Sequence, residues 1–288
     1  MQMVRFEGDG EPLCNPHFRD LVAWCHQKGI RSAMTCNGTL LDAEYINWLE
    51  AHGMRRIHIS FDGATRETFE KQRPPAKYDH VLEMCERIGG SKMQLFMNCV
   101  PSTEQIILEL EKYVLLAKSV EATGILLIKF QADKGFGETV DWNKYKGHLE
   151  EIRALAEGYG LIFVGTGETN PTFHECEDAY VCPYITLDDN VYACAYMANM
   201  RTTEIYEGQV ISTPSSNYVM GNLNDGWMKD IWRNGSYSEL RGLLKATCYP
   251  AGYSTSKETL LKEKLCDVGK SRFSYCESCL CRWGETGL

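Results

Sequence analysis

The segment Ile30–Gly63, IRSAMTCNGTLLDAEYINWLEAHGMRRIHISFDG, contains one complete strand–helix–strand unit. Ile30–Thr35 and Arg56–Phe61 are the predicted strands, and each is followed by a turn of small and polar residues. Asp42 is the expected N-cap of the helix between them, and Gly53 is its expected end. A strand, a helix and a strand in this order predict a parallel pair joined by a right-handed crossover.

The same alternation continues on both sides of this unit. Further strands are predicted over Val4–Glu7, Met93–Val100, Ile125–Phe130 and Leu161–Val164. Two further helices are predicted over Tyr78–Ile88 and Tyr145–Ala156. Another is predicted to begin at Asn15-Pro16, and a fourth is predicted to follow a capping box formed by Ser102 and Gln105. We expect the strands to be apolar on both faces, as strands of a buried parallel sheet are. The pattern predicts an α/β fold, either a doubly wound sheet or a barrel-like array of βα units.

The composition limits the classes of protein to consider. The 288 residues include 30 Lys+Arg and 39 Asp+Glu, which gives a formal net charge of −9, and 44% are hydrophobic. Such a chain can bury a core, but it lacks the basic field that collects nucleic-acid phosphates. No apolar run approaches the roughly 18 residues of a membrane-spanning helix, and the first residues do not resemble a signal peptide. We therefore expect a cytoplasmic protein that binds neither nucleic acid nor membrane.

The 13 cysteines are unevenly distributed, with five before residue 175 and eight after it. An odd number in a cytoplasmic chain is more typical of thiols and metal ligands than of disulfides. The shift in composition predicts two domains, residues 1–165 and residues 166–288. The five early cysteines are expected to be core or turn thiols: Cys14, Cys25, Cys36, Cys85 and Cys99.

Three successive predicted strands end in small or polar residues. The turns are Gly8-Asp9-Gly10-Glu11-Pro12, Thr35-Cys36-Asn37-Gly38 and Ser60-Phe61-Asp62-Gly63. One such turn alone is typical of an ordinary loop, but three at the carboxyl ends of neighbouring strands favour a site for a polar small molecule. Glycines allow the backbone to approach a ligand, and the carboxylate of Glu11 can accept a hydrogen bond from an ammonium group.

The last third of the chain contains a second candidate site. Cys182 and Cys194 flank a predicted β-hairpin, whose turn lies near Asp189-Asn190, and a hairpin brings its two ends together. Cys276 and Cys279 form a CxxC pair further along the chain. Four thiolates of this kind suit a tetrahedral site for Zn²⁺ or for an iron–sulfur cluster.

The three strand-end turns resemble the motifs of radical S-adenosylmethionine (radical SAM) enzymes in both order and spacing. The resemblance implies a partial (βα)6 TIM-like barrel that binds SAM at its open end. It implies that Gly8, Gly10 and Glu11 hold the methionine amino group of SAM. It also implies that Ser60, together with Asn37 and Asp62, faces the ribose or carboxylate. The resemblance identifies no catalytic residue.

The region between the two cysteine pairs resembles the SPASM and twitch extensions of the same enzymes. The similar stretches are Met220–Leu223, Met228–Trp232 and Tyr237–Arg241. The resemblance implies that residues 166–288 form a small cysteine-rich α+β domain. It further implies one auxiliary [4Fe–4S] cluster held by four cysteines, with Cys281 as an alternative ligand: Cys182, Cys194, Cys276 and Cys279.

One motif of the family has no counterpart here, because no CxxxCxxC occurs in the 288 residues. In the family this motif follows the first barrel strand and holds the [4Fe–4S] cluster that reduces SAM. We therefore expect a fragment that lacks the first βα unit and the SAM-reducing cluster site, and that is inactive by itself.

The resemblance implies an oxidoreductase or maturase that generates a 5′-deoxyadenosyl radical with help from an external electron donor. A peptide or protein is the expected substrate, and a sugar or aminocyclitol is the second choice. The alternative hypothesis is a non-catalytic zinc-binding module with a structural site of four cysteines. A dinucleotide-binding Rossmann fold is disfavoured, because Gly8-x-Gly10 lacks the third glycine and no acidic residue ends the second strand.

Overall fold

The computed structural model describes residues 3–8, 10–128, 140, 142–165, 183–198, 203–206, 209–212 and 215–246. The chain divides into two compact units. Unit 1 comprises Met1–Thr169 with Thr286–Leu288, and unit 2 comprises Asn170–Glu285. Each unit has its own hydrophobic core, so each is described by itself.

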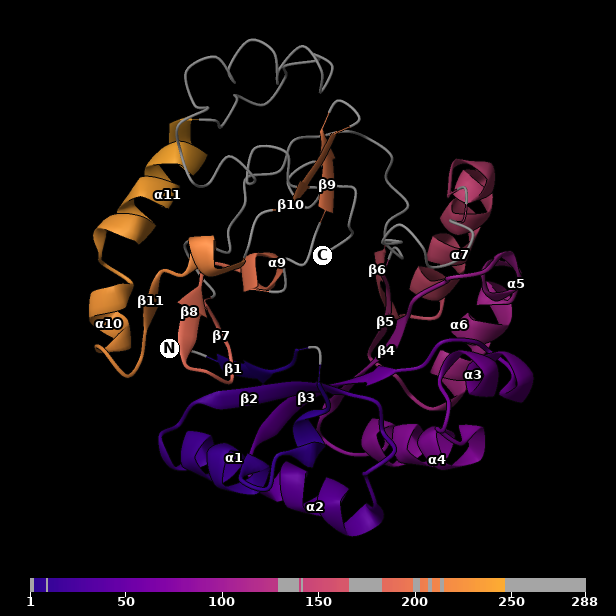
Figure 1. The fold of residues 1–288 in the computed structure, drawn as a ribbon. Helices are drawn as coiled ribbons and strands as arrows, with labels where there is room; N and C mark the ends of the chain where they lie inside the picture. The colour runs from indigo at the N-terminus through magenta and orange to yellow at the C-terminus, as the bar shows by residue number, and fades with distance from the viewer. Residues whose placement is uncertain are drawn as a thin grey trace. The chain divides into compact units, whose positions relative to one another are not determined.

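Unit 1 alternates strands and helices along the chain (Figure 1). Its strands are β1 (Met3–Phe6), β2 (Arg31–Cys36), β3 (Met54–Ser60), β4 (Gln94–Cys99), β5 (Gly124–Leu127) and β6 (Ile162–Gly165). Its α-helices are α1 (Phe18–Gln27), α2 (Ala43–Ala51), α3 (Arg66–Gln72), α4 (Tyr78–Gly89), α5 (Glu104–Leu108), α6 (Leu110–Ser119) and α7 (Lys146–Gly158). Among its described residues, unit 1 also has the short 3₁₀ helices η1 (Pro12–Cys14) and η2 (Trp142–Tyr145).

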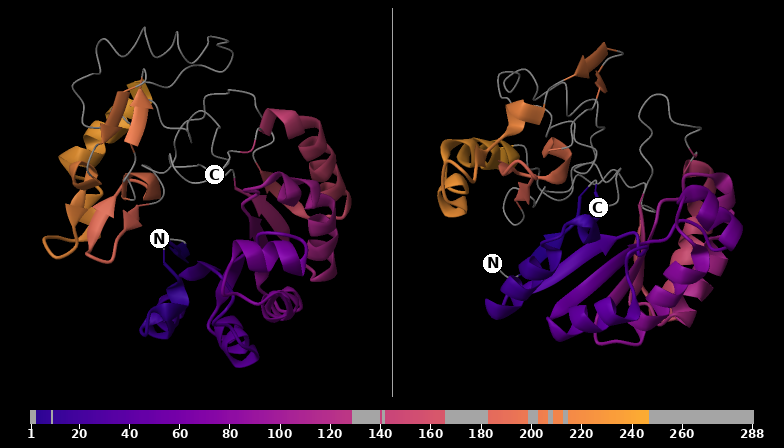
Figure 2. Two further views of the ribbon diagram at one scale, coloured as in Figure 1. Left: turned by 45° about the vertical axis from the view of Figure 1, so that its right-hand side comes forward. Right: turned by 60° about the horizontal axis from the view of Figure 1, so that its bottom comes forward.

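The six strands form one parallel sheet in the order β1-β2-β3-β4-β5-β6. Each strand therefore lies beside the next one along the chain. A doubly wound sheet reverses its strand order at a switch point, whereas a barrel-like array does not. The structure thus decides between the two predicted architectures in favour of the barrel-like array, and the helices follow the outside of the curved sheet (Figure 2).

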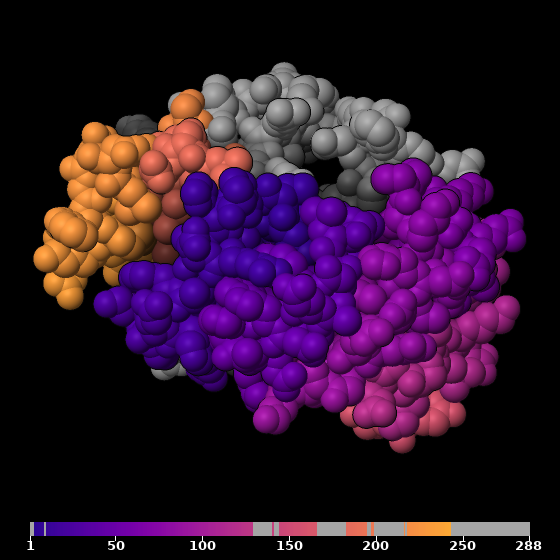
Figure 3. All heavy atoms as spheres, turned by 90° about the horizontal axis from the view of Figure 1, so that it is seen from below, coloured from indigo at the N-terminus to yellow at the C-terminus, as the bar shows by residue number. Residues whose placement is uncertain are grey.

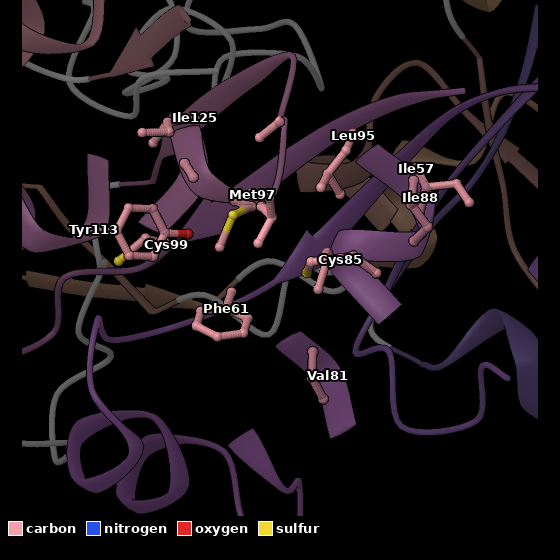
Figure 4. Close-up of a cluster of buried hydrophobic side chains, with 14 of the residues drawn as sticks. Ile57, Phe61, Val81, Cys85, Ile88, Leu95, Met97, Cys99, Tyr113 and Ile125 are labelled. Carbon is pink, nitrogen blue, oxygen red and sulfur yellow. The ribbon is translucent and has the colours of Figure 1, made fainter. Parts of the chain in front are cut away.

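The helix-facing side of the sheet holds the core of unit 1. Alternate strand residues, among them Ile57, Leu95 and Met97, are buried against the helices. Figure 4 shows these side chains beside Val81 and Ile88 of α4. Seen from the side of α1, α2 and α4, the outer side chains of the helices form a continuous surface over the sheet (Figure 3).

Two predicted helices are present, but each begins later than the sequence pattern indicates. The helix expected at Asn15-Pro16 begins at Phe18, because η1 and a turn come first. The capping box expected at Ser102 is wrong: Thr103 caps α5, and the Ser102 hydroxyl donates to Gln72 instead. Asp42, by contrast, caps α2 as predicted, since its Oδ1 accepts from the backbone N–H of Tyr45 at 2.7 Å.

Unit 2 contains a hairpin and short helices. Its elements are β7 (Tyr184–Ile185), β8 (Asn190–Tyr192), α9 (Ala195–Ala198), β9 (Thr203–Tyr206), β10 (Gln209–Ser212), η3 (Ser215–Tyr218), β11 (Gly221–Asn222), α10 (Met228–Ile231) and α11 (Gly235–Ala246). The hairpin predicted around Asp189 is confirmed, because β7 and β8 are antiparallel and Thr186 N–H donates to the Asn190 carbonyl at 3.0 Å. The Tyr237 hydroxyl of α11 donates to the Tyr192 carbonyl at 3.1 Å, which fixes α11 on the hairpin.

The stretch that resembles SPASM and twitch extensions packs on this hairpin. Gly221 and Asn222 pair with Val191 and Asn190 in the sheet order β11-β8-β7. A Cβ on Gly221 would lie 2.9 Å from Cγ1 of Ile231, so the glycine allows α10 to approach the strand. None of the helices in the described parts of the chain is long and apolar enough to cross a membrane.

Candidate functional site at the carboxyl ends of the strands

Glu11 ties together the ends of β1 and β2. Its Oε2 accepts from the backbone N–H of Asn37 at 2.8 Å, and its Oε1 accepts from the N–H of Leu13 at 3.2 Å. The side chain is half-buried at the start of η1. A carboxylate offers about four lone-pair positions, so each oxygen can still accept a hydrogen bond from a ligand.

The two glycines before Glu11 lie in the same turn, and Asp9 between them lies outside the described residues. A Cβ on Gly10 would meet no atom within 4 Å, so the space beside this residue is open in unit 1. Gly8 follows the end of β1 and is exposed. The turn therefore presents backbone and the Glu11 carboxylate at one strand end.

Asn37 shapes the next turn along the sheet. Its Oδ1 accepts from both the backbone N–H and the hydroxyl of Thr39, at 2.8 and 2.6 Å. This leaves the side-chain NH₂ as its available donor group. Gly38 has φ +77°, and a Cβ there would lie 3.0 Å from Cγ1 of Val81, so a side chain at this position would be strained.

Ser60 is the last residue of β3 and is half-buried. Asn98 of β4 lies opposite it in the register. Cys36 lies opposite Ile59, so the Asn37 turn and Ser60 follow at neighbouring strand ends. The structure therefore brings Glu11, Asn37 and Ser60 to the same edge of the sheet.

Asp62 lies at the same edge but is engaged with protein groups. Its Oδ2 accepts from Nε of Arg73 at 2.7 Å, and its Oδ1 accepts from the N–H of Val100 at 2.7 Å. The residue is only 7% exposed. Burial raises the pKa of Asp62, and the Arg73 charge and the Val100 hydrogen bond act against this shift. Its contacts make Asp62 a link between the ends of β3 and β4.

The face of the sheet opposite the helices, called the inner face here, is polar over its central strands. Thr35, Arg56, His58 and Asn98 are followed in sequence by buried core residues of their strands. Arg5 of the edge strand β1 precedes Phe6, which is partly buried against the core. The expectation of strands apolar on both faces is therefore wrong for this sheet. A period of two along residues 56–61, polar at even and apolar at odd positions, is the sequence signal that indicates it.

His58 is the most enclosed ionisable group among these inner-face residues, with 7% exposure. Its Nδ1 is 2.9 Å from Oδ1 of Asn98, and its ring stacks on Phe96 at a centroid distance of 5.0 Å. Burial lowers the pKa of His58. Arg5 and Arg56 lower it further, while Asn98 and Glu7 oppose the shift. The imidazole is therefore neutral at pH 7 and does not add to the positive charge of this face.

The His58 shift predicts a pH dependence of stability. An unfolded histidine titrates near pH 6.5. Between that value and its lower folded pKa, only the unfolded chain takes up the proton, so the free energy of unfolding falls as the pH falls. Urea unfolding at pH 7.5 and pH 5.5 should show a smaller loss for His58→Gln than for the wild type. Equal losses in the two proteins would contradict the assignment.

Of the predicted cluster ligands, only Cys194 lies within the described residues. It lies two residues after β8 and is half-buried. Cys182, Cys276, Cys279 and the alternative Cys281 lie outside them. Within the described ranges, no three His, Cys, Asp or Glu side chains come together as a metal site.

The early cysteines are core and turn thiols, as predicted. Cys25, Cys36, Cys85 and Cys99 are buried, and Cys14 is exposed in η1. Burial raises the pKa of all four buried thiols, and it is the largest cause in each case. Thiols of this kind are poor nucleophiles and poor metal ligands at neutral pH.

One cleft of unit 1 lies away from these strand ends. It has a volume of about 630 Å³ and is lined in part by Arg31, Glu50, Gly53, Arg55 and Lys92. These residues lie at the beginnings of β2 and β3, at the end of α2 and before β4. In parallel βα folds the chemistry is found at the opposite ends of the strands. The cleft therefore does not belong to the candidate site.

Comparison with known proteins shows what this chain is similar to. Residues 6–114 match the sequence profile of the Radical SAM superfamily. The curated relatives include a tungsten-containing aldehyde ferredoxin oxidoreductase cofactor-modifying protein of Pyrococcus furiosus, 24% identical over 87% of this chain and 72% of the relative. They also include mycofactocin maturase MftC of Mycobacterium tuberculosis, 24% identical over 81% of this chain and 59% of the relative.

Among solved structures, Streptococcus suis SuiB has a similar fold, with a TM-score of 0.63 and 13% identity. The match covers 83% of this chain and 57% of SuiB. SuiB has also been solved bound to S-adenosylmethionine and bound to its precursor peptide SuiA, and both structures match with a TM-score of 0.61. The chain thus spans less than two thirds of the length of MftC and of SuiB.

Proposed function

We propose that the protein acts in a radical SAM enzyme that modifies a peptide or protein. The observation that carries the proposal is the position of Glu11, Asn37 and Ser60 at neighbouring strand ends, within the residues that match the Radical SAM profile. MftC is named a maturase, and SuiB has been solved bound to its precursor peptide. The similarity to these two proteins supports a peptide or protein as the substrate class. A sugar or aminocyclitol, by contrast, gains no support from these relatives.

The residues at the strand ends fit the polar parts of SAM. Glu11 would accept from the ammonium group of the methionine moiety, beside the open space at Gly10. Ser60 and the NH₂ group of Asn37 would donate to the ribose or carboxylate. Asp62 would act indirectly, by holding the ends of β3 and β4 together. When bound and reduced through an iron–sulfur cluster with an external electron donor, SAM supplies a 5′-deoxyadenosyl radical that removes a hydrogen atom from a substrate.

SAM binding to the 288-residue chain, measured by equilibrium dialysis, tests this assignment. A hydrogen bond to a charged group contributes about 1.5–3 kcal/mol, so Glu11→Gln should weaken SAM binding roughly 10- to 100-fold. Glu44→Gln is the matched control, because Glu44 is exposed in the first turn of α2. Equal affinities for the wild type and Glu11→Gln would remove Glu11 from the site.

We further propose that unit 2 carries the auxiliary [4Fe–4S] cluster on Cys182, Cys194, Cys276 and Cys279, with Cys281 as the alternative ligand. The hairpin supports the first pair. Tyr184 of β7 lies opposite Tyr192 of β8, and in the sequence Cys182 comes two residues before β7 and Cys194 two residues after β8. Gly221 and Asn222 pair with β8, so the hairpin strand that precedes Cys194 is held in a sheet. This supports Cys194 as a cluster ligand in a fixed position.

Metal analysis after anaerobic reconstitution with iron and sulfide tests the cluster. We expect about four irons per chain and the brown absorbance of an iron–sulfur protein. Cys194→Ser should lose both, whereas Cys14→Ser should retain them, because Cys14 is an exposed thiol of η1 in unit 1. Stoichiometric zinc that survives reconstitution would instead favour a structural zinc site with four cysteine ligands.

A further inference from the structure

Two arginines of the inner face lie in one row across the sheet. Arg5 lies opposite Ala33, Ala33 opposite Arg56, and Arg56 opposite Gln94. Neighbouring strands are about 4.8 Å apart, so the Cα atoms of Arg5 and Arg56 are separated by about 10 Å. Ala33 adds only a methyl group between them. The row therefore carries two arginines that are separated by one small residue.

The charges in this row are only partly compensated. Arg5 pairs with Glu7 at 2.8 Å, and both side chains are partly exposed, at 44% and 36%. Arg56 contacts neutral groups: its Nε and Nη2 lie 3.2 and 3.1 Å from Oε1 of Gln94, and its guanidinium lies 4.8 Å from the centre of the Phe96 ring. The described strands β1 to β6 themselves contain no acidic residue, and Glu7 directly follows β1.

The surroundings of Arg56 favour an additional anion. Burial lowers the pKa of Arg56, and the charges of Arg5 and Arg55 act in the same direction. A guanidinium that is half-buried near a second one gains from a carboxylate, which it can bind through two parallel hydrogen bonds. The next row of the inner face adds Thr35, the neutral His58 and Phe96, which are suited to the uncharged part of a ligand.

We propose that Arg5 and Arg56 form a carboxylate-binding site that holds an acidic group of the peptide substrate. This inference rests on the proposed function and specifies its substrate. Ser60 is four residues beyond Arg56 on the same face, or about 13 Å at 3.3 Å per residue. The site is therefore separate from the strand-end residues assigned to SAM, and the ligand between them lies along Thr35, His58 and Asn98. An acidic side chain and a free C-terminal carboxylate share the required chemistry.

Binding of three short peptides to the full 288-residue chain tests the proposal. The probes are acetyl-Gly-Glu-Gly-amide, acetyl-Gly-Gln-Gly-amide, and acetyl-Gly-Gln-Gly with a free carboxyl end, titrated by ligand-observed NMR. We expect the wild type to bind one or both carboxylate peptides at least about tenfold more tightly than the neutral amide, because hydrogen bonds to charged groups contribute about 1.5–3 kcal/mol. The preferred probe then identifies the source of the carboxylate.

Arg56→Gln and Arg5→Gln should each reduce this preference severalfold, and Arg55→Gln should reduce it much less. Arg55 is the matched control, because it is exposed and lines the cleft at the other end of the strands. Thermal unfolding of each variant shows whether it is folded. Since the two arginines lie on different strands, either variant suffices if the other does not fold. Equal binding of all three peptides to the wild type would overturn the proposal.

Equilibrium dialysis with SAM separates this inference from the proposed function. Arg56→Gln should bind SAM as the wild type does. If Arg56→Gln weakens SAM binding as much as Glu11→Gln does, the carboxylate belongs to SAM and the inference is wrong. If the wild type prefers carboxylate peptides but binds no SAM, the proposed function fails while the carboxylate site stands.

Discussion

Replacing Asp62 with alanine should lower the free energy of unfolding of unit 1 by about 3–5 kcal/mol, the usual cost of removing one partner from a buried ion pair. The Asp62 carboxylate accepts from Arg73 and from the backbone N–H of Val100, both at 2.7 Å. Its side chain is 10% exposed and that of Arg73 is 26% exposed, so water replaces these contacts poorly. Alanine would leave a partly buried guanidinium and a backbone donor without their acceptor.

Urea unfolding followed by tryptophan fluorescence would measure this loss. Asp79→Ala is the matched control: Asp79 also pairs with an arginine, Arg66, but the two side chains are 67% and 57% exposed. Exposed ion pairs contribute little to stability. If Asp62→Ala unfolded like the wild type and lost SAM affinity instead, Asp62 would be a direct SAM ligand, as the family motif implies.

Gly89→Ala should destabilise unit 1 by about 3 kcal/mol or more, at the upper end of overpacking effects. Gly89 is the last residue of α4, and a Cβ there would lie 1.8 Å from the carbonyl oxygen of Val120. The atoms it would meet belong to the backbone of Val120 and Glu121, so no side-chain rotation relieves the overlap. The helix would have to move away from the turn that leads into β5.

The neighbouring glycine provides a control of opposite sign. A Cβ on Gly90 would lie 3.5 Å from the Glu86 carbonyl oxygen, which is an ordinary contact, and its φ of −74° suits alanine. Gly90→Ala should therefore raise stability by about 0.4–1 kcal/mol, because alanine restricts the unfolded chain. Thermal unfolding midpoints of the two variants should lie on opposite sides of the wild type. Equal midpoints would show that α4 does not approach Val120 as described.

The alternation of strands and helices could be read from the sequence because each element carries its own local signal. Asp42 and Gly53 mark the two ends of α2, and the structure confirms both. Helix α3, by contrast, is not predicted by the sequence pattern: it has seven residues, and its capping box uses Thr65 with Thr68 rather than the usual Glu or Gln. The Ser102 error has a similar origin, since Ser102 and Thr103 are adjacent and both are good caps.

The candidate site was only partly predictable. The turns at Glu11, Asn37 and Ser60 could be found because small and polar residues follow three successive predicted strands, in an order and spacing that resemble known motifs. The role of Asp62 depends on its contacts with Arg73 and Val100, which are 11 and 38 residues away in the sequence. A local sequence pattern cannot predict contacts over such separations. The Arg5–Arg56 row depends on the register of strands β1, β2 and β3. The β2–β3 register shifts between Ser32 and Ala33, and no local sequence pattern predicts this shift.

The alternation along residues 56–60 of β3 has a consequence for how the sequence of this strand can change. Ile57 and Ile59 are fully buried in the core, whereas Arg56, His58 and Ser60 face the other way. From residue 56 to residue 60, every second residue is thus constrained by core packing, and the residues between them are constrained by what the inner face contacts. Substitutions at positions 56, 58 and 60 can therefore change what the inner face binds while the buried residues are kept, and directed evolution should randomise these three positions first.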